Sequence, residues 1–317
     1  MKTYTHTTGN NPKEAAGKTT ASFFGIICGI LAAVCYGTNP LGALKLYEQG
    51  MPTGSVLFFR FGIAWVIIAL VMLIRSIPHN GVQKECLKVT VKEFGALTAL
   101  GLLFTISSLT LYLSFHLMDA GVASTILFTY PVMTAVIMAL FFHERAGWTT
   151  IAAIALSVVG VGLLYWGDGT ATLPIGGVIL VLLSALSYAL YIIVVNRSNL
   201  QMSSFKINFF VLFYCAIGML IYSFASGEPL TLPQNGTSWF YVGWLAFVPA
   251  IMALVLLVYA AKYIGSTTTA ILGALEPLTA VLIGIFVFGE SFTATLAVGI
   301  VLILMAVTII VTKKRKL

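Results

Sequence analysis

The chain has 317 residues, of which 59% are hydrophobic and only 9% carry a charge. Soluble globular domains carry about 25% charged residues, so this composition excludes a water-soluble fold and indicates an integral membrane protein. The net charge of +7 does not indicate binding to nucleic acid, because the basic residues fall between the apolar segments and at the ends of the chain.

Ten apolar segments follow one another along the chain. Each is near the length of about 20 residues that crosses a hydrocarbon core as an α-helix. Their weak period-two alternation argues against membrane β-strands. The sequence therefore predicts an all-α membrane protein with ten transmembrane helices, at residues 21–45, 53–74, 94–116, 119–142, 147–166, 174–196, 203–226, 237–262, 264–288 and 292–312.

The basic residues are distributed unequally between the two sides of these spans. When the gaps are assigned alternately to the two sides, one side holds every lysine and arginine except Lys45 and Arg60, which lies deep within a span. Cytoplasmic segments of membrane proteins carry such an excess. We therefore expect both termini, and Cys86 in the loop at 75–93, to be cytoplasmic, which an even number of spans permits.

The two halves of the chain repeat one another. Aligning the FTYP sequence that ends at Pro131 with the GALEP sequence that ends at Pro277 also aligns Glu144 with Glu290. Each of these glutamates closes a long apolar helix. The order and spacing of these residues indicate two copies of one unit.

The first span of each half also matches, with Tyr36 of the first half corresponding to Tyr188 of the second. Five spans in each copy make the second copy enter the bilayer from the opposite side, as in the inverted repeats of many secondary transporters. We divide the chain into a disordered cytoplasmic tail at 1–20, five-helix repeats at 21–167 and 168–312, and a basic cytoplasmic tail at 313–317.

Several functions lack their sequence signals. No pair of histidines or cysteines has metal-ligand spacing, and neither G-x-x-x-x-G-K-[ST] nor G-x-S-x-G occurs. An integral membrane enzyme acting on lipids would need a catalytic cluster near an interface, and the sequence shows none. We expect no cofactor, no metal, no nucleic-acid partner and no enzymatic activity, and the chain alone lacks the site for ATP-driven transport.

Two charged residues fall deep within the predicted spans, where a charge is costly and usually functional. Arg60 lies in the second span, and Glu276 lies near the middle of the ninth, directly before Pro277. The two could pair with each other or with backbone carbonyls and lock the bundle, and for Arg60 we favour that structural role. For Glu276 an equally open interpretation is a carboxylate that takes up and releases a proton during transport.

Prolines inside spans 1, 4, 8 and 9 predict interrupted helices, of which the sequence YGTNP at 36–40 is the most polar. Tyrosines that lie deep in the spans need hydrogen-bond partners and could line a cavity for an amphipathic solute. Each of them could instead be a structural hydrogen bonder. The predicted substrate-binding set is Tyr36, Asn39, Tyr112, Tyr130, Tyr188, Tyr191 and Glu276.

Several features occur together in this chain: ten spans, two repeats, the YGTNP sequence in span 1, Arg60-Phe61 in span 2, and the endings Glu144-Arg145 and Glu290 of spans 4 and 9. In these features the chain resembles the EamA family of the drug/metabolite transporter superfamily. The resemblance covers about 21–312. It implies an inner-membrane carrier whose central cavity is lined by helices 1, 3, 4, 6, 8 and 9, with helices 5 and 10 at the periphery. Relatives in this superfamily export amino acids or other small metabolites, and some exchange sugar phosphates or nucleotide sugars.

We therefore expect a secondary transporter of the inner (plasma) membrane that exports a small amphipathic metabolite, such as an amino acid, by alternating access. An exchanger of anionic sugar phosphates should show several basic residues in its pathway, where this sequence has only Arg60. A non-transporting membrane protein should carry conspicuous soluble segments. The expected partners are a small-molecule substrate and the lipid bilayer, with protons as a candidate coupling ion, and the oligomeric state stays open.

Overall fold

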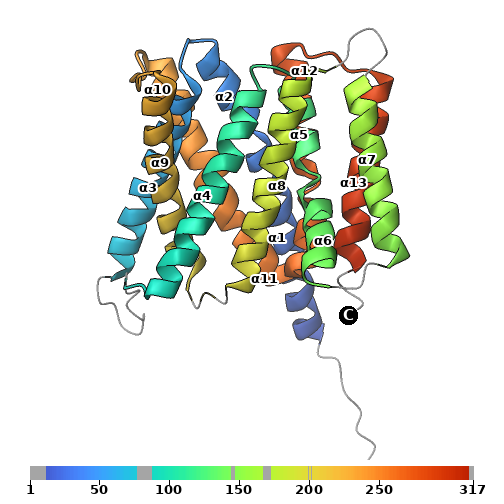
Figure 1. Cartoon of the computed structure of the whole chain (residues 1–317). Helices are drawn as coiled ribbons and strands as arrows, with labels where there is room; N and C mark the ends of the chain where they lie inside the picture. The colour runs from blue at the N-terminus through green and yellow to red at the C-terminus, as the bar shows by residue number, and fades with distance from the viewer. Residues whose placement is uncertain are drawn as a thin grey trace, which may run out of the picture.

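The computed structural model describes residues 12–76, 88–143, 147–166, 173–198, 200 and 202–313, and every regular element within them is a helix. Figure 1 shows the helices packed as one upright bundle. Their bounds are α1 Pro12–Gly37, α2 Asn39–Tyr47, α3 Thr53–Ser76, α4 Val91–Ser114, α5 Ala120–Leu127, α6 Tyr130–Phe141, α7 Trp148–Trp166, α8 Ile175–Arg197, α9 Ser204–Ser226, α10 Gly236–Phe247, the π-helical turn η1 Val248–Met252, α11 Ala253–Leu272, α12 Leu275–Phe288 and α13 Ala294–Lys313.

The prediction of ten transmembrane helices is confirmed. Ten segments of the described chain are long and apolar enough to cross a membrane, and their bounds agree with the predicted spans to within a few residues. Six spans are single helices. The other four, spans 1, 4, 8 and 9, are each assembled from two or more of the elements named above.

The four interrupted spans are those with internal prolines. Helix α1 gives way to α2 at Thr38, two residues before Pro40, and α5 gives way to α6 just before Pro131. Span 8 loosens into the π-helical turn that contains Pro249, and span 9 is interrupted just before Pro277. Proline lacks the N–H that would continue the helical ladder, so the backbone breaks next to each one. The breaks in spans 4 and 9 occupy equivalent places in the two repeats.

The start of α1 corrects one boundary. Residues 12–20, which the sequence assigned to a disordered tail, continue the first helix, because α1 begins at Pro12. Proline is favourable at the first helical position, and the following residues include alanine, lysine and glutamate, which are good helix formers. Residues 1–11, residues 314–317 and Cys86 lie outside the described part of the chain.

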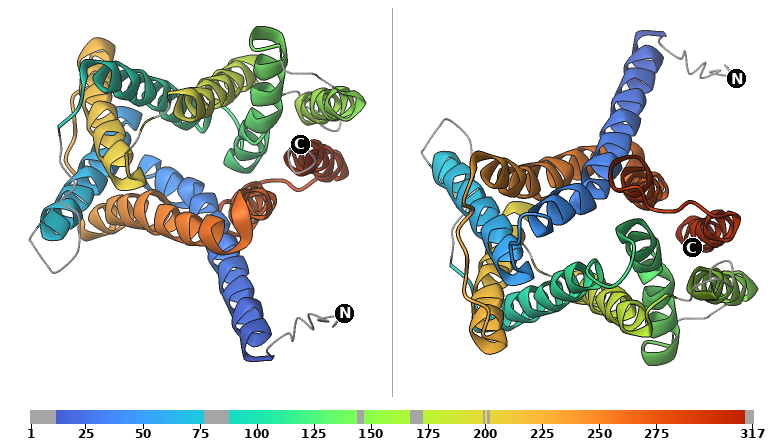
Figure 2. Two further views of the ribbon diagram at one scale, coloured as in Figure 1. Left: turned by 90° about the horizontal axis from the view of Figure 1, so that it is seen from below. Right: turned by 90° about the horizontal axis from the view of Figure 1, so that it is seen from above.

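The two halves are interleaved rather than set side by side. Helix α1 of the first half packs along α11 and α12 of the second, and α4 of the first half packs along α8 and α9. Figure 2 shows these as two walls that face each other, with α7 and α13 paired at one side. Close packing depends on small residues: a Cβ added at Gly25 would lie 2.7 Å from the Cβ of Tyr263, and one at Gly29 would lie 2.6 Å from Leu272.

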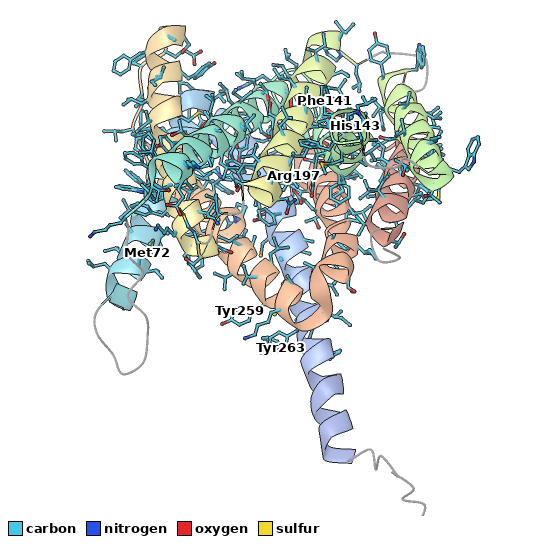
Figure 3. The ribbon with its side chains drawn as sticks, turned by 60° about the horizontal axis from the view of Figure 1, so that its bottom comes forward. Met72, Phe141, His143, Arg197, Tyr259 and Tyr263 are labelled. Carbon is cyan, nitrogen blue, oxygen red and sulfur yellow. The ribbon has the colours of Figure 1, made fainter. Side chains whose placement is uncertain are left out.

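Both described chain ends, Pro12 and Lys313, lie at the same end of the bundle, which we name the terminal face (Figure 1). The other end is named the opposite face. Exposed aromatic residues such as Tyr259 and Tyr263 project from α11 beside α1 (Figure 3), and their rings stack at 6.5 Å. Such amphipathic rings are typical of membrane–water interfaces.

Candidate functional site

The break in span 1 brings polar groups into the middle of the bundle. The Thr38 hydroxyl donates to the carbonyl of Cys35 at 2.7 Å and accepts from the indole N–H of Trp244 at 3.3 Å. The Asn39 amide donates to the carbonyl of Tyr36 at 2.8 Å. The bonds to Cys35 and Tyr36 satisfy backbone carbonyls next to the break in the helix. Tyr36 and Asn39 are half-buried.

Three tyrosines gather beside the break in span 4. Tyr130, the first residue of α6, meets the ring of Tyr188 edge-on at 4.7 Å, and Tyr188 stacks on Tyr191 one turn further along α8 at 5.7 Å. Phe104 of α4 packs against both α8 tyrosines. All three tyrosines are half-buried. They form an aromatic surface with hydroxyl groups, which suits a solute with apolar and polar parts.

Glu276 lies at the break in span 9, in the first turn of α12. Within the described residues its carboxylate has no hydrogen-bond partner, and its side chain is half-buried. Electrostatic interactions connect it with Tyr36, Tyr130 and Tyr188. Helix α1 approaches closely here, since a Cβ at Gly37 would lie 2.6 Å from the Glu276 carbonyl oxygen.

Arg60 of α3 reaches the same region through Tyr112. Its Nη1 donates to the Tyr112 hydroxyl at 2.6 Å, and that hydroxyl donates to Oδ1 of Asn39 at 3.3 Å. Tyr112 is fully enclosed, with 1% of its surface exposed, so its hydroxyl is committed to these two neighbours. It holds Arg60 and Asn39 in place and does not itself line an open surface.

The structure thus collects the predicted site residues around the breaks of spans 1, 4 and 9. Contacts or electrostatic interactions link most of them to one another, and Tyr191 joins through Tyr188. The linked residues are Tyr36, Asn39, Tyr130, Tyr188 and Glu276. Sequence reasoning left out Trp244 and Phe104, and it gave Arg60 a structural role outside the substrate-binding set. Trp244 and Phe104 carried no distinguishing signal among many aromatic residues, whereas Arg60 was visible as a charge within a span.

The opposite face is joined by a carboxylate that crosses from one half to the other. Glu290, two residues beyond α12, accepts hydrogen bonds from the backbone N–H groups of Ala120 at 2.9 Å and Gly121 at 3.2 Å. These are unpaired donors at the start of α5, where a helix favours negative charge. We name this contact the Glu290 clamp. A Cβ at Gly284 would collide with the same carboxylate, so glycine leaves it the room.

Opposing influences act on the pKa of the Glu290 carboxyl group in the clamp. Burial and the neighbouring Asp119 raise the pKa of Glu290, and the two backbone N–H bonds only partly offset that rise. Burial also raises the pKa of Asp119. The carboxylate therefore retains its proton at a higher pH than an ordinary glutamate does.

Further polar contacts join the halves at this face. The Ser238 hydroxyl donates to Oε1 of Gln49, and the backbone N–H of Thr231 donates to the Ser55 hydroxyl at 2.9 Å. Within the first half, at the same face, the Thr53 hydroxyl lies 2.9 Å from Nε2 of His116.

A separate cavity of about 440 Å³ lies between α3 and α9 and is lined by apolar side chains, among them Phe58, Trp65 and Phe213. None of the predicted site residues lines it. Binding sites for small metabolites need a few placed polar groups, so the broken-helix region is the better candidate. Among the described residues no group of three histidine, cysteine or acidic side chains could hold a metal ion.

Ten apolar helices, with breaks that collect polar side chains between two repeated halves, define a membrane transporter. The sequence model of the EamA-like transporter family matches residues 23–166 and 175–312, five spans in each match. The chain belongs to this family.

Relatives agree with that assignment. YicL, an uncharacterized inner membrane transporter of Salmonella typhimurium, is 24% identical over 302 residues, which are 92% of this chain and 96% of YicL. An uncharacterized transporter of Archaeoglobus fulgidus is 29% identical over 191 residues, 60% of this chain and 67% of its own length. A crystal structure of another protein has the same fold, with a TM-score of 0.63 at 17% identity over 94% of this chain and 98% of that chain.

Proposed function

We propose that the protein is a secondary transporter of the inner (plasma) membrane that exports a small amphipathic metabolite, such as an amino acid, by alternating access. The observation that carries the proposal is the cluster of half-buried tyrosines, Asn39 and Glu276 at the breaks of spans 1, 4 and 9. Broken helices supply polar groups at membrane depth in transporters built from inverted repeats.

The chemistry of the cluster supports an amphipathic solute. Aromatic rings of Tyr130, Tyr188 and Tyr191 offer apolar contact, while their hydroxyls, the Asn39 amide and the Glu276 carboxylate offer hydrogen bonds. A sugar-phosphate exchanger is the less favoured candidate. A phosphate ester carries up to two negative charges, and among the described residues Arg60 is the one basic residue that lies away from the ends of the spans.

Alternating access requires the site to open first to one side of the membrane and then to the other. The Glu290 clamp and the bonds from Ser238 to Gln49 and from Thr231 to Ser55 join the halves at the opposite face. We infer that these contacts must separate for the site to reach that side.

The orientation is proposed from the basic residues, with the terminal face in the cytoplasm. A membrane-impermeant maleimide applied to intact cells should leave Cys86 unlabelled, and labelling should appear after permeabilisation. The other three cysteines, Cys28, Cys35 and Cys215, are buried and give a low background. Ready labelling from outside would overturn this orientation.

The transport proposal is tested by a substrate screen in proteoliposomes. Vesicles containing the purified protein are loaded with radiolabelled amino acids, amines or sugar phosphates, and efflux is compared with that of protein-free vesicles. Saturable efflux of amino acids or similar solutes supports the proposal. Efflux confined to sugar phosphates would favour the anion exchanger, and no efflux of any compound would contradict both.

A further inference from the structure

Arg60 is a buried cation that has no anionic partner among the residues that the structure describes. It lies about seven residues, or roughly 10 Å, from the start of α3, and only 7% of its surface is exposed. A charge in this position is costly unless it is paired. Yet no ion pair within the described residues includes Arg60, and its one hydrogen bond goes to the neutral Tyr112 hydroxyl.

Most of the hydrogen-bonding capacity of this guanidinium is unused. The group has five N–H donors, of which one is committed to Tyr112 at Nη1. Nε is fully enclosed and has no partner in the described structure. Within the described part of the chain, the edge formed by Nε and Nη2 is therefore free of protein acceptors. This edge matches the two oxygens of a carboxylate through parallel hydrogen bonds.

The neighbours of Arg60 connect it with the predicted substrate site. Tyr112 links it to Asn39 at the break of span 1. Electrostatic interactions reach Tyr36 from Arg60 and also from Glu276. The unpaired cation thus lies at the edge of the cluster that Tyr36 and Asn39 belong to, and not in a separate part of the bundle.

We propose that Arg60 binds the carboxylate of the transported metabolite, with Tyr112 as the residue that positions its guanidinium. The proposal rests on the proposed function, because it assigns a partner to a residue of that transport site. One cation matches a single negative charge, which selects a monocarboxylate over a phosphate ester. Nε is enclosed in this conformation, so binding requires the flexible arginine side chain to turn toward Asn39.

Binding is tested first, without transport. The thermal unfolding of purified protein is followed with benzoate and with its neutral analogue benzamide. Benzoate should bind the unmodified protein more tightly than benzamide by roughly tenfold or more, as expected for charge-assisted hydrogen bonds. Arg60→Gln should abolish that preference. Lys45→Gln removes the same charge from an exposed pair with Glu48, and it should leave the preference unchanged.

Equal binding of benzoate and benzamide by the unmodified protein, or a preference that survives Arg60→Gln, would overturn the proposal. Should Arg60→Gln fail to fold, Arg60→Lys retains the charge but loses the planar fork, and benzoate affinity should fall roughly tenfold. Unchanged affinity in that variant would also count against it. Efflux of amines without benzoate binding would overturn this inference alone, whereas benzoate binding without efflux of any solute would contradict the transport function alone.

Discussion

Helix α12 has a carboxylate near each end, and the two have opposite surroundings. Glu290, just beyond its C-terminus, accepts two backbone N–H groups from the other half of the protein. Glu276, in its first turn, has no hydrogen-bond partner among the described residues and interacts electrostatically with tyrosines. A carboxylate satisfied by the protein holds the fold together, whereas one left unsatisfied is available for a proton or a ligand.

The largest expected effect follows from neutralising the unsatisfied carboxylate. If Glu276 carries protons, Glu276→Gln mimics its protonated form and should abolish accumulation driven by a pH gradient, while substrate exchange continues. Its stability should change by less than about 1 kcal/mol, because no partner is left unpaired. Uptake and exchange are compared in proteoliposomes, with Glu48→Gln at the exposed pair with Lys45 as the control. A stable Glu276→Gln protein with unchanged pH dependence would rule out the proton role.

Substitutions around Glu276 should weaken transport without preventing membrane insertion. Tyr36→Ala, Asn39→Ala and Tyr188→Ala each remove a polar or aromatic contact of the proposed site, and we expect roughly tenfold lower transport rates. Rates are measured at equal amounts of inserted protein. Tyr259→Ala, on an exposed surface of α11, is the matched control and should transport normally. Normal rates in all three site variants would show that the central assignment is wrong.

Removing the satisfied carboxylate should cost stability instead. Glu290→Gln keeps one oxygen acceptor but turns an amide donor toward the second backbone N–H at the start of α5, so thermal unfolding in detergent should show a loss of about 2 kcal/mol. Glu228→Gln, on the same face, should have a smaller effect because the hydrogen bonds of Glu228 in the described structure are made by its backbone and not by its carboxylate.

A second variant tests the same clamp without changing its charge. Gly284→Ala places a methyl group against the Glu290 carboxylate and should destabilise the protein. Gly243→Ala in α10 meets no atom within 4 Å and should be neutral or stabilising, since alanine favours a helix. If both glycine variants behave alike, the clamp contributes little to stability.

The smallest effect concerns His116 at the opposite face. Burial lowers its pKa, and Glu228 only partly offsets that shift. As the pH is lowered, His116 therefore takes up its proton near pH 6.5 in the unfolded chain and only at a lower pH in the folded protein. The free energy of unfolding consequently decreases as the pH falls through 6.5. The decrease is small because the ring is partly exposed. Thermal unfolding on both sides of pH 6.5 should show a weaker pH dependence in His116→Gln, and an unchanged dependence would assign it to other groups.

Much of the architecture was predictable from the sequence. The thickness of the bilayer fixes the length of each apolar segment, so the spans could be counted before any packing was known. The prolines also located the interrupted helices, because proline removes a backbone donor wherever it stands. One place was predicted less well, because residues 12–20 looked like a tail but extend α1. Arg60 was expected to pair with Glu276 or with backbone carbonyls, and in the described structure it donates to the Tyr112 hydroxyl.

The sequence by itself determined the membrane class, the ten spans, the two repeats and the family, because these depend on composition and local spacing. Only the tertiary structure decided which polar groups meet. It enclosed Tyr112 between Arg60 and Asn39, left Glu276 without a hydrogen-bond partner in the described chain, and brought Glu290 to the start of α5, 170 residues away from it in sequence at Ala120. Such contacts depend on how helices from the two halves pack against one another, and no local pattern of residues specifies that packing.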